Sequence, residues 1–114
     1  MIKVLRKKML TLPEVEKLLR EKAKNTELSS TEQLTLDYVS KVSKIKAEGA
    51  VKLFEKLLEF GVKEETAVQI INILPDNEEE LRIILIPEGK FYSHEELRSM
   101  LELIEKIRKE YGKK

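Results

Sequence analysis

The sequence predicts an all-α protein, a bundle of about six helices preceded by a short N-terminal strand. Leu, Glu and Lys dominate its 114 residues, whereas glycine occurs four times and tryptophan and cysteine are absent. Apolar residues recur at three- and four-residue spacing along most of the chain. Three apparent helix starts, at Thr11, Ser30 and Ser93, have glutamate or glutamine three residues later, the spacing of a capping box.

Residues 2–10 form the predicted strand, because their apolar side chains follow no helical stripe. Ile2 and Val4 lie on one face of such a strand, and Leu5 and Met9 lie on the other. A lone strand in a helical protein has no mate of its own. It would therefore add to the sheet edge of a partner, or else be a frayed chain end.

Two helices are predicted next, from Thr11 to the polar run near residue 25 and from Ser30 to about Ser43. The first has a narrow apolar stripe made of Leu12, Val15, Leu18, Leu19 and Ala23. The second is apolar over roughly 200° of its circumference, because Leu36 and Val39 extend the arc of Leu34, Tyr38, Val42 and Ile45. This helix is either central to its own bundle or partly in contact with another protein.

Four further helices are predicted, over residues 47–60, 63–74 and 77–86 and from Ser93 onward. Gly61 stands where a left-handed residue ends a helix, and Pro75 and Pro87 stop the next two helices. The last helix has the cleanest stripe, formed by Leu97, Met100, Leu101, Ile104, Ile107 and Tyr111.

The net charge of +1 names no partner, but charge is unevenly distributed along the chain. Residues 1–25 contain eight basic and three acidic groups, and residues 63–96 contain three basic and nine acidic groups. The closing residues 97–114 are basic again. Such segments could orient an encounter with a patterned surface, or they could simply be solvated helix faces.

The sequence offers no catalytic, cofactor-binding or metal-binding residues. Its single histidine, His94, is expected at the surface, and the absence of cysteine removes thiol chemistry. Glu78, Glu79 and Glu80 suit a helix N-terminus better than a metal. No apolar run could span a bilayer and no secretory stretch is apparent, so a cytoplasmic protein is expected.

Three segments together resemble an archaeal family of DNA-directed RNA polymerase subunits, the counterpart of the fourth subunit of eukaryotic RNA polymerase II. They are LTLPEVEKLL (10–19), ELSSTEQLTLDYVSKVSK (27–44) and GVKEETAVQIINILPDNEEELRIIL (61–85). The most specific pieces are residues 35–39, the set Ala67, Ile70 and Ile71 before Leu74 and Pro75, and residues 80–82. The resemblance covers nearly the full length and rests on order and spacing.

The resemblance implies an accessory subunit without catalysis of its own, within a nucleotidyltransferase, DNA-directed RNA polymerase. It implies a stalk subunit that forms a heterodimer near the RNA exit with the counterpart of the eukaryotic seventh subunit, which we call the stalk partner. This pair would support initiation, elongation and termination by contacting nascent RNA. It further implies two domains, a docking region over residues 1–45 and a bundle over 46–114 similar to the helicase and RNase D C-terminal (HRDC-like) fold.

The interface with the stalk partner is expected at apolar residues of the strand and of the first two helices: Ile2, Val4, Leu5, Met9, Leu12, Val15, Leu19, Leu36 and Val39. Lys3, Arg6, Lys7 and Lys8 could contact RNA phosphates, or could keep the strand soluble. An alternative function is a free-standing HRDC-like nucleic-acid-binding module. A ubiquitin-associated adaptor is more distant, suggested only by a weak resemblance around the loop at residues 60–62.

Overall fold

The computed structural model describes residues 10–113, and the predicted strand lies outside this range except for its last residue. The described residues form six α-helices and a single 3-10 turn. These are α2 (Leu12–Asn25), α3 (Ser30–Val42), α4 (Ala47–Glu59), α5 (Glu64–Ile73), α6 (Glu78–Ile84), η1 (Ile86–Glu88) and α7 (His94–Tyr111). Between residues 10 and 113 the only extended pairing is an isolated antiparallel bridge of Ile45 with Gly112. The all-α prediction is confirmed.

Capping boxes begin three of the helices. Thr11 and Glu14 exchange hydrogen bonds at the start of α2, and Ser93 and Glu96 do so at the start of α7, as predicted. The cap of α3 is Ser29 with Glu32, one residue before the predicted Ser30. Both serines have a suitable residue three positions later, and the carboxylate of Glu32 is the group that accepts from the cap backbone at 2.9 Å.

The ends of the middle helices depend on special backbone conformations. Gly61 has φ +90° after α4, which confirms the predicted left-handed residue. Leu74 ends α5 with φ 52°, an uncommon angle for a residue with a side chain. The fifth predicted helix is shorter than expected: α6 ends at Ile84, and Pro87 lies within η1 instead of stopping a continuous helix. A proline disfavours α geometry in the residue before it, so the chain tightens there.

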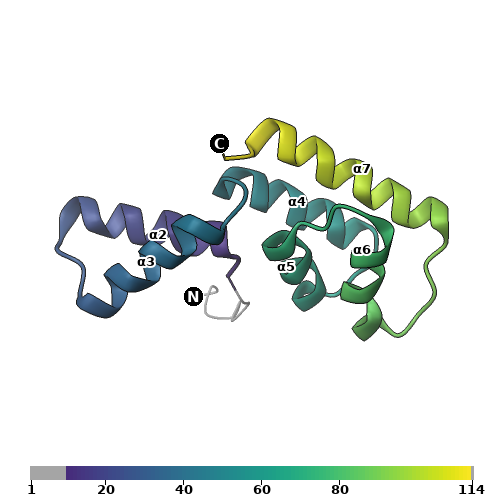
Figure 1. Ribbon diagram of the computed structural model, residues 1–114, viewed down its shortest axis with the longest axis horizontal. Coiled ribbons are helices and arrows are strands. Elements are labelled where there is room, and N and C mark those ends of the chain that lie inside the picture. The colour runs from purple at the N-terminus through teal and green to yellow at the C-terminus, as the bar shows by residue number, and fades with distance from the viewer. Residues whose placement is uncertain (1–9, 114) are drawn as a thin grey trace.

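Helices α4 to α7 form a bundle, and α2 and α3 form a hairpin that extends from one end of it (Figure 1). Within the bundle α4 packs against α5 and α7, and α6 packs against α7. The principal extents of 48 × 35 × 20 Å and the radius of gyration of 15.2 Å describe an elongated molecule. A compact chain of this length would have a radius of about 13 Å.

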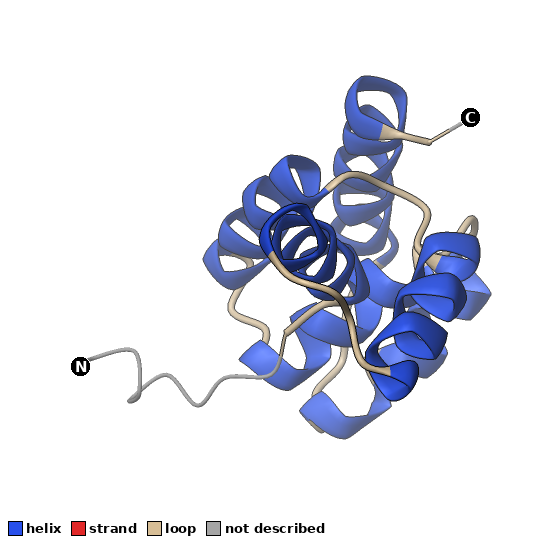
Figure 2. Ribbon diagram, turned by 90° about the vertical axis from the view of Figure 1, so that its left-hand side faces the viewer, coloured by secondary structure: helices blue, strands red, loops and turns tan. Residues whose placement is uncertain are grey.

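The main hydrophobic core belongs to the bundle alone. Its buried residues run from Ile45 to Ile107, and Leu53, Ile70, Leu81 and Met100 are among those fully buried. The hairpin contacts the bundle mainly through α2 and α4, and Figure 2 shows the two parts from the hairpin side. The division into two domains after residue 45 stays a prediction.

A close approach of α4 and α7 depends on Gly49. A Cβ built on Gly49 would lie 2.5 Å from Cβ of Tyr111 and 2.7 Å from its Cγ, well inside van der Waals contact. The start of α4 and the end of α7 can therefore meet only because this position has no side chain. Helix propensity works against this choice, since glycine inside a helix costs about 1 kcal/mol relative to alanine.

The Gly49→Ala variant should therefore lower the free energy of unfolding, by about 1–3 kcal/mol, in spite of its better helix propensity. Urea unfolding followed by circular dichroism measures the change. Glu48→Ala, at the exposed neighbouring position, is the matched control and should be close to neutral. A Gly49→Ala variant more stable than the wild type would show that the close approach imposes no constraint.

Candidate partner interface

The described residues bring no catalytic or metal-binding group together. His94 is exposed, and its Nδ1 lies 2.7 Å from Oε1 of Glu78. Within residues 10–113 no three His, Cys, Asp or Glu side chains are placed to hold a metal ion. None of the helices in this range is long and apolar enough to cross a membrane. The features that remain are a buried ionic junction and several exposed apolar surfaces.

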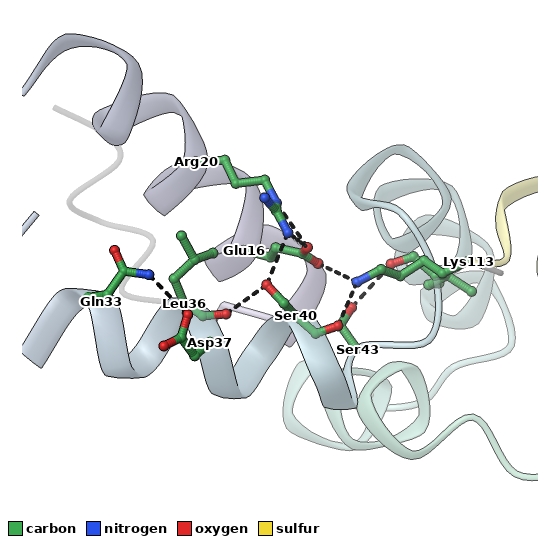
Figure 3. Close-up of polar contacts among 9 residues, drawn as sticks. Glu16, Arg20, Gln33, Leu36, Asp37, Ser40, Ser43 and Lys113 are labelled. Atoms are coloured by element: carbon green, nitrogen blue, oxygen red, sulfur yellow. Dashed lines mark hydrogen bonds and ion pairs between the residues drawn. The ribbon is translucent and has the colours of Figure 1, made fainter.

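The ionic junction joins the hairpin to the C-terminal segment of the chain (Figure 3). The carboxylate of Glu16, on α2, is 11% exposed and accepts hydrogen bonds from Lys113 Nζ at 2.8 Å and from Arg20 at 2.9 and 3.0 Å. Lys113 also donates to the carbonyl of Ser40 at 3.1 Å, and Arg20 donates to the Ser40 hydroxyl at 3.0 Å. The Ser40 hydroxyl in turn donates to the carbonyl of Leu36 at 2.7 Å. We call Glu16, Arg20, Ser40 and Lys113 the ionic clasp.

Backbone hydrogen bonds hold the segment after α7 against the connection between α3 and α4. The N–H of Lys113 donates to the carbonyl of Lys44 at 3.1 Å, and the N–H of Lys46 donates to the carbonyl of Tyr111 at 2.9 Å. These two bonds make up the isolated bridge of Ile45 with Gly112. The side chain of Lys113 is thus delivered to Glu16 by a fixed backbone.

A second connection ties the hairpin to α5. The N–H of Leu12 donates to Oδ1 of Asn72 at 2.9 Å, and the Lys44 ammonium donates to the carbonyl of Ile73 at 2.8 Å. Helix α5 has no basic residue in its own last turn, so Lys44 supplies a hydrogen bond that its terminal carbonyls need. The direction in which the hairpin extends from the bundle is therefore set by polar contacts at several points.

The environment of Glu16 shifts its pKa. Burial of this carboxyl raises its pKa, but hydrogen bonds and the positive charges of Lys113 and Arg20 outweigh that effect. The net result is a pKa below the ordinary value of 4.5. The ionised form of Glu16 is therefore the one that the folded protein stabilises.

Helix α3 has two apolar sides, and only one of them faces the chain itself. Leu36 and Val39 are 8% and 2% exposed, so they pack within the protein. Leu34 and Tyr38, one turn apart on the other side, are 70% and 62% exposed. The expectation that Leu36 and Val39 reach a partner needs correction, because the side chains left uncovered on α3 are Leu34 and Tyr38. The period of a helix fixes how residues group into faces, but not which face the chain covers.

Helix α2 shows a similar split. The predicted residues Leu12, Val15 and Leu19 are half-buried, whereas Leu10 and Leu18 are exposed. A groove of about 520 Å³ runs between α2 and α4, lined by Leu10, Glu14, Lys17, Leu18, Glu21, Ala47, Glu48 and Val51. Sequence reasoning missed Leu10 and Val51 as part of one surface, because they belong to segments that meet only in the fold.

The remaining predicted contacts lie outside the described residues. These are Ile2, Val4, Leu5 and Met9 of the expected interface, and Lys3, Arg6, Lys7 and Lys8 as possible RNA contacts.

Acid should weaken the fold through Glu16. Because its pKa is lowered on folding, the stabilisation from the clasp is complete above the unfolded value near 4.5 and is lost as the pH falls through the folded value. Glu16→Gln should lower the free energy of unfolding at pH 7 by about 1–3 kcal/mol, and this deficit should shrink in acid. Urea unfolding from pH 3 to pH 7 measures both effects.

Glu27→Gln is the control for this series, since Glu27 is exposed on the connection between α2 and α3. It should follow the wild-type pH profile. A deficit in Glu16→Gln that stays constant with pH would mean that the clasp carboxylate does not gain stability from ionisation.

Comparison with known proteins places this architecture in one family. The family described as RNA polymerase Rpb4 matches residues 9–108. The DNA-directed RNA polymerase subunit Rpo4 of Methanocaldococcus jannaschii is 35% identical over 107 residues, which cover 94% of this chain and 88% of that protein. The subunit Rpo4 of Saccharolobus solfataricus is 30% identical over 92 residues, covering 80% and 81%. The chain therefore belongs to the RNA polymerase Rpb4 family of accessory subunits, which are not themselves catalytic, and the resemblance drawn from its sequence is confirmed.

Proposed function

We propose that this chain is the stalk subunit of a DNA-dependent RNA polymerase and docks through its α2 and α3 hairpin on the stalk partner, the counterpart of the eukaryotic seventh subunit. The observation that carries the proposal is the exposed apolar side of that hairpin. Leu34 and Tyr38 are more than half exposed although they occupy a regular helix, and Leu10 and Leu18 add exposed apolar side chains at α2. Burying such side chains in a heterodimer is favourable.

The geometry of the hairpin supports this role. It extends from the bundle instead of lying along it, and the ionic clasp and the Asn72 contact hold it there. A surface that is ordered before binding loses little conformational entropy when a partner covers it. Leu36 and Val39 then contribute indirectly, by fixing α3 from within, while Leu12, Val15 and Leu19 line the half-buried side of α2.

The N-terminal residues would extend the same interface. Ile2, Val4, Leu5 and Met9 have the pattern expected of a strand, and a sheet edge of the stalk partner would supply a mate for it. The heterodimer would lie near the RNA exit in the cytoplasm and support initiation, elongation and termination.

RNA contact by this chain would be electrostatic and weak. Lys3, Arg6, Lys7 and Lys8 are the candidates, and they lie beside the docking residues in the sequence. Residues 63–96 contain nine acidic groups against three basic ones, so this part of the bundle repels phosphate. That charge also disfavours the alternative of a free-standing nucleic-acid-binding module, and nascent RNA would be met chiefly by the stalk partner.

The two sides of α3 provide a test of the docking surface. The double variant Leu34→Asp with Tyr38→Asp should fold normally and bind the stalk partner at least about 30-fold more weakly, the effect of losing about 2 kcal/mol at a hot spot. Val39→Asp should instead destabilise the chain itself, because it buries a carboxylate without a partner. Calorimetric titration with the stalk partner and thermal unfolding of each variant separate the two effects.

Ile83→Asp is the matched control, since Ile83 is 66% exposed on the bundle and lies outside the proposed interface. It should leave the affinity for the stalk partner unchanged. The docking surface would be misassigned if the hairpin double variant binds as tightly as the wild type, or if Ile83→Asp weakens binding equally. Steeply salt-dependent RNA binding by a chain that ignores the stalk partner would favour the free-standing module.

A further inference from the structure

The far end of the bundle exposes a second apolar surface. Ile83 of α6, Ile86 of η1 and Phe91 of the following loop are 66%, 70% and 81% exposed. They occur within nine residues of chain, and we call them the α6 patch. Single exposed apolar residues are ordinary on protein surfaces, but three large ones in one short segment are typical of an interaction site.

The fold does not need these side chains for its own core. Leu81 and Leu85, one turn apart, face inward and are 0% and 2% exposed. Ile83 lies between them in sequence and therefore on the opposite side of α6. The sequence thus places a large apolar residue at a position that the bundle leaves uncovered.

The surroundings of the α6 patch are acidic. Residues 78–96 contain six carboxylates against two cations, Arg82 and Lys90. Both cations are engaged at Tyr92: Arg82 donates to its carbonyl at 3.4 Å, and the Lys90 ammonium lies 5.3 Å from the centre of its ring. Glu79 is exposed one turn before Ile83. The charge left for a partner to meet is negative.

The α6 patch lies away from the hairpin. Figure 1 shows α6 and the hairpin toward opposite ends of the long axis, which measures 48 Å. A partner that covers Leu34 and Tyr38 would therefore leave Ile83, Ile86 and Phe91 accessible.

We propose that the α6 patch is a second docking surface, which takes a basic amphipathic segment of another protein. Apolar side chains of that segment would cover Ile83, Ile86 and Phe91, and its lysines or arginines would meet the carboxylates around them. RNA and anionic membranes fit poorly, because both would bring negative charge to an acidic surface. The inference goes beyond docking on the stalk partner and does not depend on it.

A synthetic helix tests this surface directly. The probe is a peptide of about 16 residues with leucines at three- and four-residue spacing and lysines elsewhere, titrated into the full chain by two-dimensional NMR. We expect the largest shifts at residues 79–91 and an affinity that falls with salt. Phe91→Ser and Ile83→Ser should each weaken binding at least about tenfold, whereas Leu34→Ser, equally exposed on the hairpin, should not.

Two peptide controls and one solution measurement complete the test. A scrambled peptide of the same composition and a peptide with glutamate in place of lysine should both bind weakly. Circular dichroism should show native folding in the serine variants, and Ile86→Ser replaces either one that fails.

The proposal is overturned by absence of binding at low salt, by equal binding of the scrambled peptide, or by an equal loss in Leu34→Ser. Self-association in sedimentation experiments that Ile83→Ser abolishes would assign the patch to a second copy of this chain instead. Shifts at residues 79–91 on addition of single-stranded RNA would likewise contradict it.

Discussion

The contact between Glu16 and Lys113 joins residues 97 positions apart and fixes how the two parts of the molecule meet. A largely buried carboxylate is costly unless it is paired, and Lys113 and Arg20 together supply the pairing. The clasp needs the segment after α7 to reach the hairpin, which in turn needs α7 to end against the start of α4. Gly49 allows that approach, so one missing side chain in α4 is a condition for an ion pair on α2.

This dependence gives the clasp a directional role. The main core lies within the bundle, and α2 and α3 do not contribute to it. Hydrophobic burial is non-directional, so apolar contact alone would leave the angle of the hairpin loosely defined. Hydrogen bonds from Lys113 to Glu16 and from Leu12 to Asn72 have strict geometry and remove that freedom. An extended hairpin with a defined direction is what a docking element requires.

The sequence predicted those features that local chemistry determines. Helix starts at Thr11 and Ser93 depend on side chains three residues apart, and the turn at Gly61 depends on the glycine itself. The covered side of α3 was not predictable, because Leu34 with Tyr38 and Leu36 with Val39 are both apolar pairs on one helix. Nothing in the spacing of Glu16 and Lys113 reveals that they meet, since that contact is a product of the tertiary fold.

The uneven distribution of charge has a structural counterpart at the two ends of the molecule. The hairpin combines exposed apolar residues with the basic first segment, and the end that contains α6 combines them with carboxylates. Two apolar surfaces of the same kind on one small protein would compete for the same partners. Opposite charge around each gives them different partners, because like charges across an interface are strongly unfavourable. A net charge close to zero is then the sum of two surfaces that select against each other's ligands.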